Sequence, residues 1–174
     1  MNSSKLLLTV GLLAGFAFPL VAADSAPSTV EVVYVDQDKF TDVKDRYGAN
    51  ERANPGYLRE LKSHVERTAA RRLNEGQKLT ITITDIDMAG DFEPWRSPQF
   101  QDVRIVKDIY PPRVNLSFRL TDAAGAVIAE GERELRDLSF NMRAPTVPTN
   151  DPLRHEKALL DDWLRKELRT AKKS

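Results

Sequence analysis

The chain contains no cysteine among its 174 residues. This absence excludes disulfide-stapled scaffolds, zinc sites built on thiolates and cysteine nucleophiles. A chain of about 150 residues does not need such staples, because it buries roughly 70% of its unfolded surface on folding. We therefore expect a fold that is held together by an apolar core.

An excess of charge of either sign is also missing. The chain has 26 basic and 26 acidic residues, and removal of a leader that contains Lys5 would leave 25 against 26, a net charge of −1. Domains that bind nucleic acid carry a basic excess. The overall charge therefore excludes nucleic acid as an expected partner and argues against strong attraction to anionic lipid.

Familiar catalytic signatures are absent from the sequence. It contains no HExxH, no GxSxG and no glycine-rich loop of the kind that binds phosphate. The two histidines do not restore an enzyme prediction, because helical phase places His64 on the outer face of one helix and His155 in the first turn of another. The sequence predicts no cofactor and no metal.

Long apolar runs are missing except at the amino terminus. Residues 1–23 carry a single charge, Lys5, followed by an apolar run that ends in Val21-Ala22-Ala23. A basic start, an apolar middle and a small-x-small end are typical of a secretory signal peptide. The run is shorter than the roughly 18 to 20 residues of a membrane span. We predict cleavage after Ala23, a periplasmic or secreted location and no membrane span in the mature protein; an uncleaved anchor is the alternative.

Residues 24–174 predict a single domain of mixed strands and helices. Strands are expected at residues 29–35, 79–88, 103–109, 113–121 and 127–138, and helices at 54–75 and 151–170. The first strand, helix and strand predict a parallel, right-handed pair. Pro111 and Pro112 mark the third strand as an edge strand, because neither residue has an N–H for a ladder.

The hairpin at residues 113–138 has one apolar face, and both helices have an apolar stripe. We therefore predict an α+β fold: a two-layer sandwich with a mixed sheet of four to five strands and both helices on one face. In the expected register Thr121 pairs with Ala126, so that Phe118 faces Ala129 and Ser117 faces Glu130. The side chains expected to be largely buried are Leu61, Val65, Ile81, Ile83, Leu116, Phe118, Leu120, Leu160 and Leu164.

Several blocks of sequence resemble one protein family. The blocks are residues 85–90 (DIDMAG), 92–95 (FEPW), 103–113 (VRIVKDIYPPR), 153–157 (LRHEK) and 160–163 (LDDW). With these blocks the chain resembles the secreted bacterial proteins grouped as domain of unknown function 3016. The resemblance covers nearly all of residues 24–174 and implies a one-domain envelope protein of Gram-negative bacteria. It implies no activity, cofactor or catalytic residue.

The second predicted strand breaks its own alternation. Leu79, Ile81 and Ile83 share one face, whereas Ile86 and Met88 lie on the other. This pattern predicts a β-bulge near Thr84-Asp85 or the departure of the strand from the sheet. The same place is the carboxyl end of a parallel strand pair, where ligands of open α/β sheets bind. We therefore place the candidate site there.

The candidate binding residues are charged or aromatic side chains close to this break. They are Asp85, Asp87, Asp91, Trp95, Arg104, Asp108 and Arg113. Three interpretations stay open for them. They are a structural network of salt bridges and caps, a binding surface anchored by Phe92, Trp95 and Tyr110, or a carboxylate hydrolase or metal site. The spacing of the aspartates does not match a calcium-binding loop.

We favour a non-enzymatic envelope domain that binds an unidentified envelope protein or a small ligand. The alternative is a small secreted hydrolase that uses a carboxylate cluster at Asp85, Asp87 and Asp91. Strand phase leads us to expect Asp85, Asp87, Arg104, Asp108 and Arg113 in one connected polar cluster, with Trp95 packed against its edge.

Overall fold

The computed structural model describes residues 29–46, 52–142, 144 and 146–171. The predicted signal peptide at residues 1–23, including its cleavage site, lies outside these residues. Among the described residues, no helix has both the length and the hydropathy of a membrane-spanning segment.

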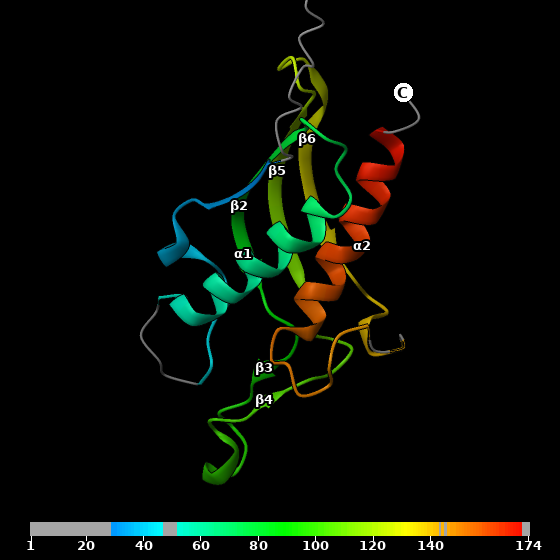
Figure 1. The fold of residues 1–174 in the computed structure, drawn as a ribbon. Helices are drawn as coiled ribbons and strands as arrows, with labels where there is room; N and C mark the ends of the chain where they lie inside the picture. The colour runs from blue at the N-terminus through cyan, green and yellow to red at the C-terminus, as the bar shows by residue number, and fades with distance from the viewer. Residues whose placement is uncertain (1–28, 47–51, 143, 145, 172–174) are drawn as a thin grey trace, which may run out of the picture.

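A four-stranded mixed sheet forms one layer of the molecule (Figure 1). Its strands are β1 (Thr29–Tyr34), β2 (Lys78–Asp87), β5 (Arg113–Thr121) and β6 (Val127–Arg136), in the order β1-β2-β5-β6. β1 pairs with β2 in parallel, and β2–β5 and β5–β6 are antiparallel. The predicted parallel pair of the first crossover is confirmed.

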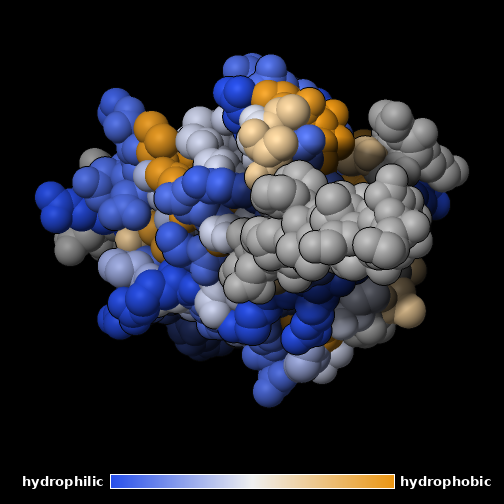
Figure 2. Space-filling model, turned by 45° about the horizontal axis from the view of Figure 1, so that its top comes forward, coloured by the Kyte–Doolittle hydropathy of each residue, from blue (hydrophilic) through white to orange (hydrophobic). Residues whose placement is uncertain are grey.

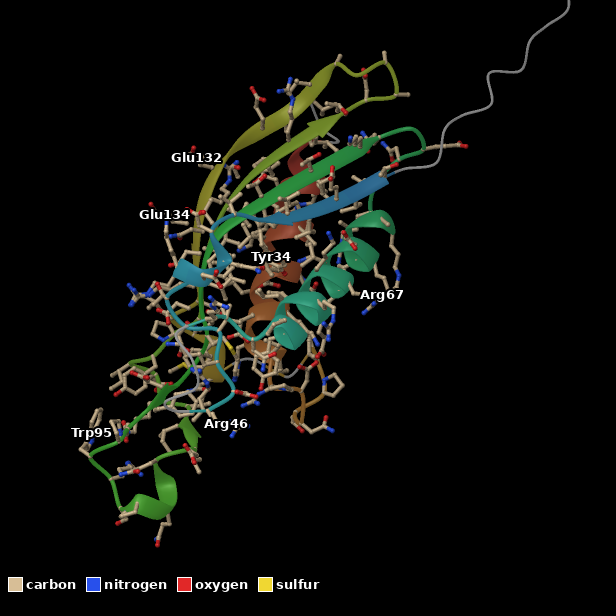
Figure 3. The ribbon with its side chains drawn as sticks, turned by 90° about the vertical axis from the view of Figure 1, so that its left-hand side faces the viewer. Tyr34, Arg46, Arg67, Trp95, Glu132 and Glu134 are labelled. Carbon is tan, nitrogen blue, oxygen red and sulfur yellow. The ribbon has the colours of Figure 1, made fainter. Side chains whose placement is uncertain are left out.

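Two helices, α1 (Pro55–Ala70) and α2 (Arg154–Ala171), form the second layer. Figures 1 and 3 show both on the same face of the sheet, as the α+β prediction requires. The side chain of Asn54 caps α1 by accepting hydrogen bonds from the N–H groups of Gly56 and Tyr57, at 2.8 and 3.3 Å. The Asp151 carboxylate accepts one from the N–H of Leu153 at 2.8 Å, just before α2.

The core lies between the sheet and the helices. Every side chain predicted to be buried is at most 4% exposed. Trp163 of α2 packs edge-on against Phe118 of β5, with ring centroids 5.6 Å apart. The other face of the sheet is polar, and Figure 3 shows Glu132 and Glu134 of β6 on the side away from the helices.

The predicted register of the β5–β6 hairpin is wrong. Thr121 pairs with Val127 rather than Ala126, and a bulge follows at once, so that Phe118 pairs with Gly131 rather than Ala129. The pairing therefore moves by two residues along β6. A two-residue shift keeps each side chain on its own face, which is why the burial prediction holds although the partners differ.

The turn explains the error. The carboxylate of Asp122 accepts hydrogen bonds from the N–H groups of Ala124 and Ala126, both at 2.9 Å. Its own N–H donates to the carbonyl of Ala126 at 2.9 Å. This Asx-type geometry makes Asp122 and Ala126 the ends of the turn, and Ile128 becomes the extra residue of the bulge.

Residues 103–109 do not form an edge strand of the main sheet. β4 (Arg104–Ile105) pairs instead with β3 (Asp91–Phe92) in a separate two-stranded sheet. This pair lies in an arm, residues 90–110, that projects from one end of the molecule (Figure 1). Pro111 and Pro112 separate the arm from β5, because they cannot extend the ladder. The arm also contains the short 3-10 helix η2 (Pro98–Phe100); η1 (Gln37–Lys39) and η3 (Phe140–Met142) lie elsewhere.

Candidate functional site

The predicted bulge in β2 is present, and it turns Asp85 toward the segment at residues 36–46. The pairing of β2 with β5 shifts between Ile83 and Asp85. The Asp85 carboxylate accepts hydrogen bonds from the N–H and the hydroxyl of Thr41, at 2.7 and 2.8 Å. The backbone of Asp42 forms an isolated parallel β-bridge with the backbone of Asp87. Asp85 therefore holds the 36–46 segment against the end of β2.

Arg104 joins the arm to the body of the protein. Its guanidinium donates to both carboxylate oxygens of Asp42, at 2.7 and 3.0 Å. It also donates to the carbonyls of Gly90 and Lys44, at 2.9 and 3.0 Å. The guanidinium lies over the ring of Phe92, with Cζ 4.6 Å from the ring centroid. Both side chains of the ion pair are less than one-fifth exposed, at 15% and 17%. Sequence reasoning identified Arg104 but missed Asp42, its principal partner.

Asp87 and Arg113 come together as predicted, with 3.8 Å between a carboxylate oxygen and Nε. Burial raises the pKa of Asp87 above its ordinary value. The Arg113 charge opposes this rise, and the charges of Asp42, Asp85 and Asp91 add to it. The carboxylate of Asp91 itself accepts a hydrogen bond from the N–H of Phe92 at 2.7 Å. These contacts are structural caps and pairs.

The prediction of one connected cluster is only partly correct. Asp108 instead accepts a hydrogen bond from Asn141, at 2.8 Å, in the segment of residues 137–149. Trp95 does not pack against the cluster: its exposed fraction is 72%, and Figure 3 shows it projecting from the arm. Strand phase failed because the chain leaves the main sheet at Gly90, where φ is +81°.

Glu93 organises the interior of the arm. It is only 2% exposed, and Lys107 donates a hydrogen bond to it. The Tyr110 hydroxyl donates to the same oxygen as Lys107, at 3.3 Å, and Nε of Arg96 lies 2.6 Å from the other oxygen. The hydrogen bond from Lys107, followed by the nearby positive charges, holds the pKa of Glu93 below its ordinary value. Glu93 is therefore ionised at neutral pH.

Glu156 is a buried carboxyl that sequence reasoning did not single out. Its exposed fraction is 1%, and one oxygen accepts a hydrogen bond from the N–H of Ala89 at 2.7 Å. Burial raises its pKa to about 7. Its burial could have been predicted from helical spacing. Glu156 lies three residues after Leu153 and four before Leu160, inside the apolar stripe of α2.

Exposed apolar side chains gather at the end of the molecule that bears the arm. Among the described residues, six of the nine exposed large apolar side chains belong to the arm or to residues 137–149. We call these six the apolar end: Trp95, Val103, Val106, Ile109, Leu138 and Met142. The hydrogen bond between Asp108 and Asn141 joins the arm to the second segment. The opposite end, turned forward in Figure 2, is mostly hydrophilic over its described surface, with small separate apolar patches.

A groove of about 530 Å³ lies beside the apolar end, between residues 137–149 and α2. His155 lines it and packs edge-on against Phe140, with ring centroids 4.8 Å apart. Burial, followed by the Arg154 charge, lowers the pKa of His155 to about 4. His64 is also placed differently from the prediction. It lies between the helices, with Nε2 2.8 Å from an oxygen of Asp161, and not on an outer face.

The three aspartates of the candidate site already have partners within the described part of the chain. Asp85, Asp87 and Asp91 are engaged with Thr41, Arg113 and the N–H of Phe92, respectively. Within the described ranges, no three acidic or histidine side chains are placed to share a metal ion. The end of the molecule that bears the arm presents exposed apolar side chains, and ion pairs hold the arm itself in place.

Comparison with known proteins gives a family match. The model of the family described as "Protein of unknown function (DUF3016)" matches residues 28–166. No curated protein matches the chain significantly. One similar solved structure is a PelC dodecamer from Paraburkholderia phytofirmans, with 16% identity and a TM-score of 0.34 over 80% of this chain and 89% of that one. Similarity at that level carries no inference for this chain.

Proposed function

Because the chain belongs to the DUF3016 family, as its sequence blocks predict, we propose that it is an exported domain of the cell envelope that binds a protein partner. Residues 1–23 have the pattern of a cleaved signal peptide, which supports the proposed periplasmic or secreted location. The partner-binding surface in this proposal is the apolar end.

The concentration of exposed apolar side chains carries the proposal. Trp95, Ile109, Leu138 and Met142 are each at least 64% exposed. Exposed apolar side chains that lie close together are typical of a protein interaction site, and these lie on two segments that a hydrogen bond joins. Aromatic side chains are also enriched among the residues that dominate binding energy at interfaces.

The framework behind these anchors supports recognition as well. Glu93 fixes Lys107 and Arg96 inside the arm, and Arg104 ties the arm to Asp42. A surface that is already ordered loses less conformational entropy when it binds. The arm therefore presents Trp95 on a pre-organised support.

The hydrolase alternative has weaker support. A pair of catalytic carboxylates would need to converge on a substrate with different protonation states. Asp85 and Asp91 instead accept hydrogen bonds from the backbone N–H groups of Thr41 and Phe92, and Asp87 pairs with Arg113. The proposed function is accordingly binding.

Site-specific photo-crosslinking in the producing cell tests the proposal. A photo-reactive phenylalanine analogue is introduced at Trp95 and, as the matched control, at Val127, which is 42% exposed in β6. We expect a discrete crosslinked product from position 95 and none of that mass from position 127. The Ile109→Ser change, in the same apolar end, should reduce the product at position 95.

If positions 95 and 127 give the same crosslinked products, the apolar end is not a specific binding surface. Location is tested separately by cell fractionation and amino-terminal sequencing of the mature protein. A cytoplasmic, full-length product would remove the envelope part of the proposal.

A further inference from the structure

A second surface, distinct from the apolar end, lies where the turn after α1 meets the carboxyl-terminal half of α2. A hollow of about 370 Å³ opens there. Its lining consists of four arginines around one apolar residue: Arg71, Arg72, Arg165, Arg169 and Leu168. Leu168 is 5% exposed and belongs to the core, so the arginines surround a fixed apolar base.

Most of this positive charge is not neutralised within the described part of the chain. Arg165 pairs with Asp162 at 2.5 Å. No described carboxylate lies within 4.0 Å of the guanidinium of Arg71, Arg72 or Arg169. Nε of Arg72 is shielded from solvent without an acceptor among the described residues. Arg67, which lies one turn before Arg71, adds a further guanidinium on the outside of α1 (Figure 3).

Favourable interaction with the helix ends does not account for all of this charge. The carboxyl-terminal end of a helix carries about half a negative charge. Two such ends and the Asp162 carboxylate offset roughly two of the four positive charges. A local excess remains, although the whole chain has no net charge.

We propose that this hollow binds a phosphate group, either a phosphomonoester or a diphosphate. The guanidinium group presents its donors in a planar fork that matches two phosphate oxygens, and it stays charged at every physiological pH. Four such groups, two from the turn that follows α1 and two from α2, surround the hollow, and the shielded Nε of Arg72 lacks an acceptor among the described residues. A multivalent oxyanion supplies both the missing negative charge and the missing acceptors.

Calorimetry with pyrophosphate at constant ionic strength tests the proposal. We expect saturable binding of one pyrophosphate per chain. The double change Arg71→Gln with Arg169→Gln should weaken binding about tenfold or more, because each lost charge-assisted hydrogen bond weakens an anion complex markedly. The matched control removes the same charge at two exposed positions elsewhere, Arg59→Gln with Arg136→Gln, and should leave the affinity unchanged.

A second pair of changes, Arg71→Lys with Arg169→Lys, keeps the charge and removes the fork, and it should also weaken binding. This pair keeps the proposal testable if the glutamine pair does not fold.

Sedimentation with phosphatidylcholine vesicles, with and without phosphatidic acid, identifies the source of the phosphate. Binding to phosphatidic acid that pyrophosphate displaces assigns a lipid headgroup, whereas soluble pyrophosphate binding without vesicle binding assigns a soluble ligand. Absence of both, or equal weakening by the control pair, overturns the proposal.

Discussion

The carboxylate of Glu156 in α2 accepts a hydrogen bond from the backbone N–H of Ala89, at 2.7 Å and in a fully buried setting. This bond fixes α2 to the point where the chain leaves β2 for the arm. The other oxygen of Glu156 has no hydrogen-bond partner among the described residues. The pair therefore links the position of the arm to the protonation of one buried group.

The Glu156→Gln change should flatten the pH dependence of stability. Burial raises the pKa of Glu156 from 4.5 to about 7. Its stabilising contribution is therefore complete below about pH 4.5 and is lost as the pH rises through about 7, a loss of roughly 3 kcal/mol. Urea denaturation between pH 5 and 8 should show a smaller fall in the free energy of unfolding for the variant than for the wild type. Glu134→Gln, on the exposed face of β6, is the control and should keep the wild-type slope.

The Asp42→Ala change should destabilise the protein by about 2 to 4 kcal/mol, because it leaves the mostly buried guanidinium of Arg104 without its carboxylate. Thermal and urea unfolding measure the loss. Glu130→Ala breaks the ion pair with Arg119, whose two side chains are about 60% exposed; that control should change stability by no more than about 1 kcal/mol. Equal effects of the two changes would show that Asp42 does not brace the arm.

The Gly90→Ala change should cost more than Gly125→Ala, although both glycines have similar positive φ angles of +81° and +84°. At Gly90 an added Cβ would lie 2.8 Å from the carbonyl oxygen of Ile105, whereas at Gly125 nothing lies within 4 Å. The control therefore reports the conformational cost alone, about 1 kcal/mol. A larger loss for Gly90→Ala, measured by urea denaturation, would come from the clash with β4. Equal losses would contradict the close approach.

Two neighbouring aspartates in β2 should respond differently to amide substitution. Asp85→Asn should destabilise the protein by about 1 to 2 kcal/mol, because Thr41 donates both its N–H and its hydroxyl to the carboxylate. Asp87→Asn should change stability little, because burial already disfavours its charge and Arg113 lies 3.8 Å away. Differential scanning calorimetry of the two variants at neutral pH tests this order. A larger loss for Asp87→Asn would make the Asp87–Arg113 pair the main brace.

Local patterns predicted the elements of the fold well. The N-cap at Asn54, the parallel β1–β2 pair and the bulge beside Asp85 each follow from a few adjacent residues. The hairpin register failed by two residues because the Asp122 turn and the bulge at Ile128 both preserve the alternation on which the prediction depended. Alternation fixes the face of a side chain and leaves its partner undetermined.

The candidate site was harder to predict because its contacts are distant in sequence. Arg104 reaches Asp42 across 62 residues, and Ala89 reaches Glu156 across 67. Periodicity within one element cannot identify such partners. Trp95 was predicted to pack against the edge of the cluster, but its 72% exposure depends on the path of the arm after Gly90, which no local pattern reports.

The position of β1 at the edge of the sheet has a consequence for how the protein folds. β5 and β6 are joined by a tight turn, whereas Thr29 of β1 must find Lys78, 49 residues later in the chain. Closing a long loop costs more entropy than closing a short one, and contacts between distant residues slow folding. We therefore expect the central antiparallel strands to assemble first. β1, although it precedes the other three strands of this sheet in the chain, should join last and complete the sheet.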